Sequence, residues 1–149
     1  MKKTITYDWY GWLLCANVLL TFGVAVIEES VCPPISDGSC SCFTYDNNVF
    51  LECPNINLVK LQKVLAAFAN TPIQSLNLYD LDKTITTFGT NDFKQDLVIR
   101  ELHITVSNLN QLNEESFARI KNNLESLFIV SSKLVKIPQK ALPQLSALH

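Results

Sequence analysis

The sequence predicts an α/β solenoid, in which short parallel strands stack side by side and each is followed by a return segment. Three observations support this fold class. An apolar pattern recurs along the second half of the chain, its recurrences are almost evenly spaced, and four clustered cysteines precede it and suit a terminal cap. The length of 149 residues suits one domain. We expect about three repeats, an N-terminal disulfide cap and an open C-terminal end.

The recurring pattern is L-x-x-L-x-L, which is clearest from Leu124 through Leu127 to Ile129. A lone helix repeats every 3.6 residues and a lone strand every 2, and neither period fits throughout. Copies of the pattern start at Ile73, Ile99, Leu124 and Leu148, at spacings of 26, 25 and 24 residues. These spacings fall within the roughly 20–29 residues of a leucine-rich repeat.

Each copy predicts one strand, over residues 73–79, 99–105 and 124–130. Because side chains alternate between the faces of a strand, the leucines and isoleucines at the pattern positions point into the core and their neighbours point outward. We expect the outward residues to form a ligand-binding concave face, comprising Ser75, Asn77, Tyr79, Glu101, His103, Thr105, Ser126, Phe128 and Val130.

The N-terminal residues 1–25 are typical of a secretory signal peptide. Lys2 and Lys3 precede an apolar run over residues 13–27, and small residues precede a cleavage point after Ala25. The run is shorter than the ~20 residues that a spanning helix needs. An uncleaved membrane anchor is the alternative, because four tyrosines and tryptophans over residues 7–12 suit a membrane interface.

Four cysteines follow the signal, Cys32, Cys40, Cys42 and Cys53. An even count in an exported chain predicts a disulfide framework, and the sequence alone allows three pairings. Strand formers on both sides of residues 46–48 predict a hairpin within this cap, residues 32–54. A structural zinc site is the alternative, although C-x-C spacing fits it poorly.

Two helices are predicted around the strands. Residues 56–70 carry apolar side chains at helical spacing, and we interpret residues 55–72 as a spacer helix that packs on the stack. A helix at a membrane surface is the alternative. A second helix is expected from Asn113 onward, because Asn113 suits a helix cap and acidic residues follow it.

The cysteine pattern Cys32-Pro33, Cys40-Ser41-Cys42 and residues 49–53 resembles the cysteine-rich N-terminal cap of extracellular leucine-rich-repeat proteins. The resemblance implies the pairing Cys32–Cys42 and Cys40–Cys53. It extends to residue 149, so the array is expected over residues 73–149. The chain is similar to arthropod secreted proteins of this family, among them the non-catalytic subunit of shrimp luciferase. Because the chain ends as a fourth copy begins, we expect a fragment or an end that a partner covers.

The expected function is non-enzymatic. The family resemblance implies a secreted protein-recognition module, and a non-catalytic scaffold subunit of a secreted enzyme complex is the alternative. No catalytic motif, cofactor motif or metal motif is found, and the formal net charge of −2 gives no electrostatic case for nucleic acid. The expected partner is a protein ligand or a partner subunit, with a membrane tether only if a longer chain exists.

Two smaller features have alternative interpretations. We interpret His103 as a polar residue of the binding face, and a general base or pH-sensitive contact is the alternative. Asp80, Asp82 and Asp92 are interpreted as solvated loop charges, with a cation site as the alternative.

Overall fold

A computed structural model describes residues 31–89, 92–93, 96–137, 139–140, 142 and 145–148. The predicted signal peptide, residues 1–25, and its alternative as an anchor lie outside these residues. The elements are β1 (Ser41–Tyr45), β2 (Asn48–Pro54), α1 (Leu58–Ala66), β3 (Ile73–Tyr79), β4 (Thr87–Phe88), β5 (Ile99–Thr105), β6 (Gln111–Leu112) and β7 (Ser126–Val130).

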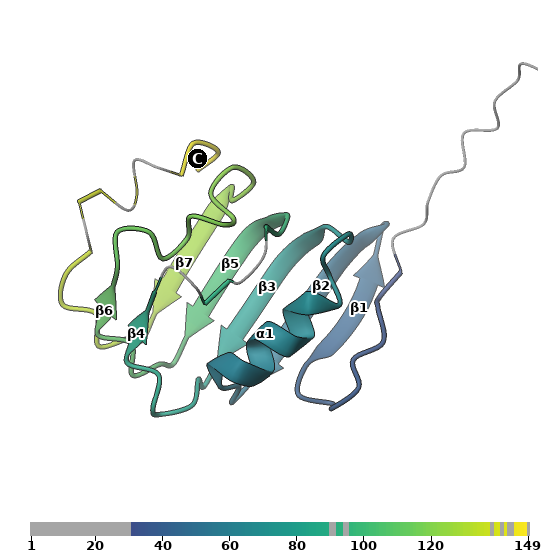
Figure 1. Cartoon of the computed structure of the whole chain (residues 1–149), viewed down its shortest axis with the longest axis horizontal. Coiled ribbons are helices and arrows are strands. Elements are labelled where there is room, and N and C mark those ends of the chain that lie inside the picture. The colour runs from purple at the N-terminus through teal and green to yellow at the C-terminus, as the bar shows by residue number, and fades with distance from the viewer. Residues whose placement is uncertain are drawn as a thin grey trace, which may run out of the picture.

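Five of the strands form one mixed sheet in the order β1-β2-β3-β5-β7 (Figure 1). β2, β3, β5 and β7 are parallel neighbours, and β1 joins β2 as an antiparallel strand. β4 and β6 form a separate parallel pair, which a bridge between Gln111 and Lys136 extends. In Figure 1, α1 and this small pair lie on the same side of the large sheet. That side is therefore covered, and the opposite side is left open.

The covered face of the sheet holds the core. Leu76 and Leu78 of β3 lie beside Leu102 and Ile104 of β5, and all four are fully buried. Parallel strands in register stack equivalent side chains in rows, so each leucine packs on its counterpart one strand away. The predicted inward positions of β7 are only partly buried, because β7 is the last strand of the sheet.

The predicted hairpin is present, and the backbone conformation of its turn suits the pairing of β1 with β2. Asp46 and Asn47 connect β1 to β2, and both have positive φ, of 46° and 59°. Two such residues make a turn whose twist matches that of the strands, and Asp and Asn tolerate this conformation better than most residues.

The four cysteines form the disulfides Cys32–Cys42 and Cys40–Cys53, with Cα–Cα distances of 5.9 and 4.3 Å. The pairing implied by the family resemblance is thus confirmed, and the zinc alternative is excluded. Each such bond typically stabilises a small domain by about 2–4 kcal/mol. The bonds hold the leading segment and β1 against β2, at one edge of the sheet.

The helix predicted within residues 56–70 is present as α1. The Asn57 side chain caps it by accepting a hydrogen bond from the Lys60 N–H at 2.9 Å. Leu61, Val64 and Leu65 are buried in the core. The helix therefore packs against the protein, as expected, and the membrane-surface alternative for its apolar face is not supported.

The α/β leucine-rich-repeat solenoid is, however, wrong as a fold class. The described structure is dominated by strands, and α1 is its one α-helix. The helix expected from Asn113 onward does not form. Backbone N–H groups of Ser116, Ala118 and Ile120 instead donate to carbonyls three residues earlier, which makes successive tight turns.

The physical reason lies in local side-chain bonding. The Ser116 hydroxyl accepts from the Asn113 N–H at 2.8 Å and donates to the Phe88 carbonyl at 2.6 Å. Serine and asparagine compete with helical backbone bonding in this way. These bonds fix the segment to β4 as a series of turns. The recurring apolar pattern of the sequence does not indicate such turns.

A left-handed residue follows each parallel strand of the large sheet. Asn55, Asp80, Val106 and Ser131 directly follow β2, β3, β5 and β7, and their φ angles lie between 46° and 52°. Asparagine and aspartate tolerate this conformation, but a β-branched valine is strained there. Val106 is 57% exposed, so packing does not compensate for the strain. A backbone hydrogen bond fixes this turn, because the Val106 N–H donates to the Val130 carbonyl at 3.2 Å.

Replacing Val106 by asparagine should therefore stabilise the protein by about 1 kcal/mol, because the strain of a left-handed β-branched residue is removed. The midpoint of thermal unfolding should rise by a few degrees. Val135→Asn is the matched control, because Val135 is 92% exposed and does not have a positive φ. A Val106→Asn protein that melts no higher than the Val135→Asn protein would show that the turn is not strained.

Candidate binding face

The uncovered side of the sheet is called the open face here. Alternation places three outward side chains on each of the five strands. The inward residues between them are buried in β2, β3 and β5 and only partly buried in β7. The open face comprises Ser41, Phe43, Tyr45, Phe50, Glu52, Pro54, Ser75, Asn77, Tyr79, Glu101, His103, Thr105, Ser126, Phe128 and Val130.

The strand register places all nine residues predicted for the binding face on the open side of the sheet, but Ser75 is buried there, with 5% of its surface exposed. The strand register places Asn77, His103 and Phe128 opposite one another in a single row across β3, β5 and β7. Parallel rows contain Tyr79 with Thr105 and Val130, and Ser75 with Glu101 and Ser126. The structure thus brings together the residues that alternation predicted.

A contact cluster on β3, β5 and β7 joins Gln74 to three side chains of the open face, Glu101, His103 and Phe128. The rings of His103 and Phe128 stack at a centroid distance of 4.5 Å. One Glu101 carboxylate oxygen accepts from the Gln74 amide at 3.2 Å, and the other lies 3.6 Å from His103 Nε2. These contacts restrict the rotamers of His103 and Glu101, so the cluster is partly ordered before any ligand binds.

Sequence reasoning missed the part of the open face on β1 and β2. Phe43 and Phe50 stack there at 5.3 Å, with their rings 8° from parallel. Glu52 lies two residues further along β2, and its side chain forms no ion pair with the described residues. The signal was present, because Val49, Leu51 and Cys53 alternate with these outward residues. The interpretation of the hairpin as a cap does not extend to this face.

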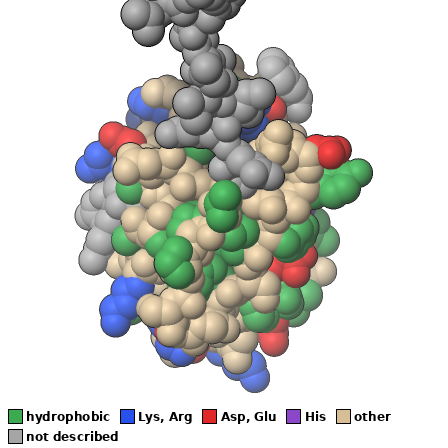
Figure 2. All heavy atoms as spheres, turned by 90° about the vertical axis from the view of Figure 1, so that its right-hand side faces the viewer, with side chains coloured by type: hydrophobic (Ala, Val, Ile, Leu, Met, Phe, Trp, Pro, Cys, Tyr) green, Lys and Arg blue, Asp and Glu red, His purple; other side chains and the backbone are tan. Residues whose placement is uncertain are grey.

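Figure 2 shows the molecule from the β1 side, where hydrophobic side chains gather near the centre and charged ones lie mostly around the rim. Phe43 and Tyr45 are the large exposed hydrophobic residues of β1. β1 carries no charged residue over Ser41–Tyr45, so this sheet edge lacks the charges that usually protect an edge strand. The aromatic character of the open face therefore extends to its edge.

A hollow in the surface lies elsewhere. Its volume is about 720 Å³, and it is bordered by β6 and by the segment that follows β7. Glu114 and Lys140 on its walls form an ion pair at 3.6 Å. Its lining includes no histidine or cysteine, and none of the predicted binding residues borders it.

Two of the three aspartates that could form a cation site, Asp82 and Asp92, serve local turns. Asp82 accepts from the Thr84 N–H at 2.9 Å and from the Thr84 hydroxyl, and these bonds lower its pKa, the hydroxyl having the larger effect. Asp92 accepts from the Gly89 N–H. No cluster of three potential metal ligands occurs among the described residues.

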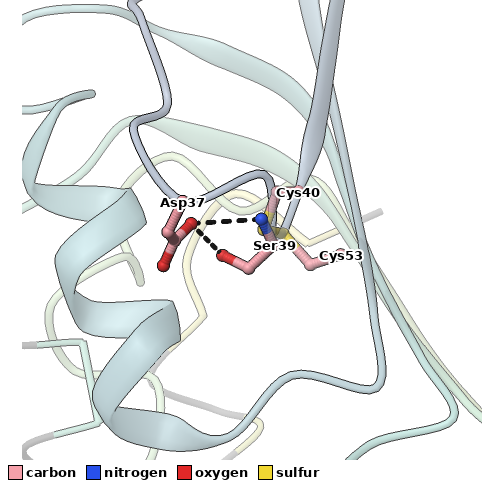
Figure 3. The surroundings of a disulfide bond; sticks show 4 residues. All are labelled: Asp37, Ser39, Cys40 and Cys53. Atoms are coloured by element: carbon pink, nitrogen blue, oxygen red, sulfur yellow. Dashed lines mark hydrogen bonds between the residues drawn. A yellow bond between two sulfur atoms is a disulfide. The ribbon is translucent and has the colours of Figure 1, made fainter.

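A similar turn precedes the Cys40–Cys53 disulfide (Figure 3). The Asp37 carboxylate accepts from the Ser39 hydroxyl and from the Ser39 N–H, and Gly38 between them has a φ of 63°. The hydroxyl and then the N–H lower the pKa of Asp37 below its ordinary value of 3.8, because both bonds favour the charged carboxylate.

These two carboxylates contribute stability above pH 3.8, and that contribution is lost as the pH falls through their lowered pKa values. Ser39→Ala should raise the pKa of Asp37 toward 3.8 and leave Asp82 unchanged, whereas Thr84→Ala should do the reverse. Carboxyl chemical shifts measured by NMR during an acid titration test this. Equal pKa values for Asp37 in the Ser39→Ala and parent proteins would show that the hydroxyl bond does not form in solution.

The two disulfides indicate that the chain folds in an oxidising environment. Over the residues that the structure describes, no helix is long and apolar enough to cross a membrane. Neither the protein-family models, nor the curated proteins, nor the solved structures contain a match to this chain.

Proposed function

We propose that this chain is a non-enzymatic, secreted protein-recognition module that binds a protein ligand on the open face. The observation that carries the proposal is the in-register row of Asn77, His103 and Phe128, with exposed aromatic residues around it. Exposed aromatic side chains on a rigid sheet are typical anchors of protein interfaces.

The composition of the face supports a protein ligand. Phe128 and Tyr79 are 48% and 38% exposed, so each can bury substantial further area in a complex. Polar side chains that lie between the aromatic residues can supply directed hydrogen bonds. The backbone beneath is paired on both sides in β3 and β5, which keeps the cost of ordering the face low.

Secretion is part of the proposal and rests on two independent features. The disulfides require an oxidising compartment for their formation. The sequence of residues 1–25 has the charge and apolar pattern of a signal peptide.

The test uses the full chain, expressed through a secretory pathway and screened against an array of purified extracellular protein domains. Phe128→Ala with Tyr79→Ala should weaken binding to any hit by about 2 kcal/mol or more, because central aromatic residues dominate interface energies. Surface plasmon resonance measures the affinity, and circular dichroism confirms that the variants stay folded.

Val59→Ala and Val135→Ala are the controls, because both valines are exposed and lie outside the open face. They should leave the affinity unchanged. If the control changes abolish binding while the aromatic changes do not, the ligand binds elsewhere and the assignment of the open face is wrong.

A further inference from the structure

The open face has a one-sided charge distribution. The whole chain carries 12 lysines and arginines against 14 aspartates and glutamates, so its charges are nearly balanced. The residues that define the open face nevertheless include two carboxylates, Glu52 and Glu101, and no lysine or arginine. Arg100, next to Glu101 on β5, is exposed and is paired with Glu125 at 2.9 Å. The single histidine of the open face, His103, lies next to Glu101. A face of this kind favours a cationic ligand.

Glu101 is positioned to accept a cation. Its side chain is 37% exposed, and the Gln74 amide holds one carboxylate oxygen at 3.2 Å. The second oxygen faces His103, whose ring is in turn fixed by stacking on Phe128. The carboxylate is thus oriented by an amide and an imidazole, and no lysine or arginine of the described residues forms an ion pair with it.

Glu52 is the second carboxylate, and its setting suits a guanidinium group in particular. It forms no ion pair with the described residues and lies on the same strand face as Phe50, whose ring stacks on Phe43. Arginine binds carboxylates through two parallel hydrogen bonds and stacks its planar group on aromatic rings. Lysine offers a point charge and uses neither geometry as well.

The separation of the two carboxylates sets the spacing of the ligand. Glu52 lies on β2, and Glu101 lies two strands away on β5 and one row along the face. From the ordinary strand separation and rise, their Cα atoms are about 12 Å apart. An extended peptide places side chains of the same face about 13 Å apart when they are four residues apart.

We propose that the ligand of the open face is an extended arginine-bearing protein segment. Two arginines four residues apart contact Glu52 and Glu101, and the guanidinium at Glu52 stacks beside Phe50. This inference rests on the proposed function, because it names the kind of protein segment that the open face binds.

The test measures binding of the folded chain to synthetic glycine–serine peptides by amide chemical shifts in NMR titrations. One peptide carries two arginines four residues apart, the second carries glutamines at these positions, and the third carries glutamates. The arginine peptide should shift open-face amides and bind at least about tenfold tighter than the other two. Its affinity should fall as the salt concentration rises, because the attraction is electrostatic.

Glu52→Gln and Glu101→Gln each remove a negative charge while preserving the shape of the side chain. Each should therefore weaken binding of the arginine peptide by about tenfold. Glu114→Gln is the matched control, since Glu114 pairs with Lys140 and lies outside the open face. Amide spectra of the free variants establish that each remains folded.

The outcomes separate the two proposals. If all three peptides shift the open face equally, or if Glu114→Gln weakens binding as much as the open-face changes, the inference of an arginine-bearing ligand is wrong and the proposed function stands. If no peptide shifts any open-face amide, the arginine inference is overturned. If, in addition, the Phe128→Ala and Tyr79→Ala changes leave the binding of the array ligands unaffected, the proposed function is wrong as well.

Discussion

The structure depends on the packing of equivalent apolar side chains across neighbouring parallel strands. Leu76 lies beside Leu102 and Leu78 beside Ile104, and none of them is exposed. Burial of a leucine or isoleucine side chain contributes about 1.5–3 kcal/mol, so these rows supply much of the favourable free energy. Because they hold the register of the strands, they also determine which side chains face outward.

These apolar rows must be covered on one side of the sheet, and the series of parallel strands must end at its first strand. α1 provides cover through Leu61 and Leu65, which are buried in the same core. The antiparallel strand β1 ends the parallel series, and a disulfide joins Cys40, the residue directly before β1, to Cys53 of β2. All of these contributions lie on the covered side or at the edge, so the outward residues remain free for binding.

The sequence predicted the strands better than the segments between them. Alternation identified Ile73–Tyr79 and Ile99–Thr105, and these strands have the predicted bounds. The return segment after β5 was misinterpreted as a helix because its composition resembles a helix start. Ser116 and Asn113 instead bond locally and to β4, a contact between residues 28 apart in the sequence that no local pattern reveals.

The candidate site shows the same division. The outward positions of β3, β5 and β7 could be predicted because side chains alternate with a period of two between the faces of a sheet. The Gln74–Glu101 hydrogen bond and the stack of His103 on Phe128 required coordinates, since alternation predicts proximity but not rotamers. Glu52 could have been found from β2, had the hairpin been considered a continuation of the same sheet.

The central claim is that parallel register places Asn77, His103 and Phe128 in one row on the open face. Nuclear Overhauser contacts between backbone protons of neighbouring strands measure that register directly in solution. The account predicts contacts that pair Asn77 with His103 and His103 with Phe128. Contacts shifted by one residue would move these side chains to the covered face and contradict both the fold and the proposed binding surface.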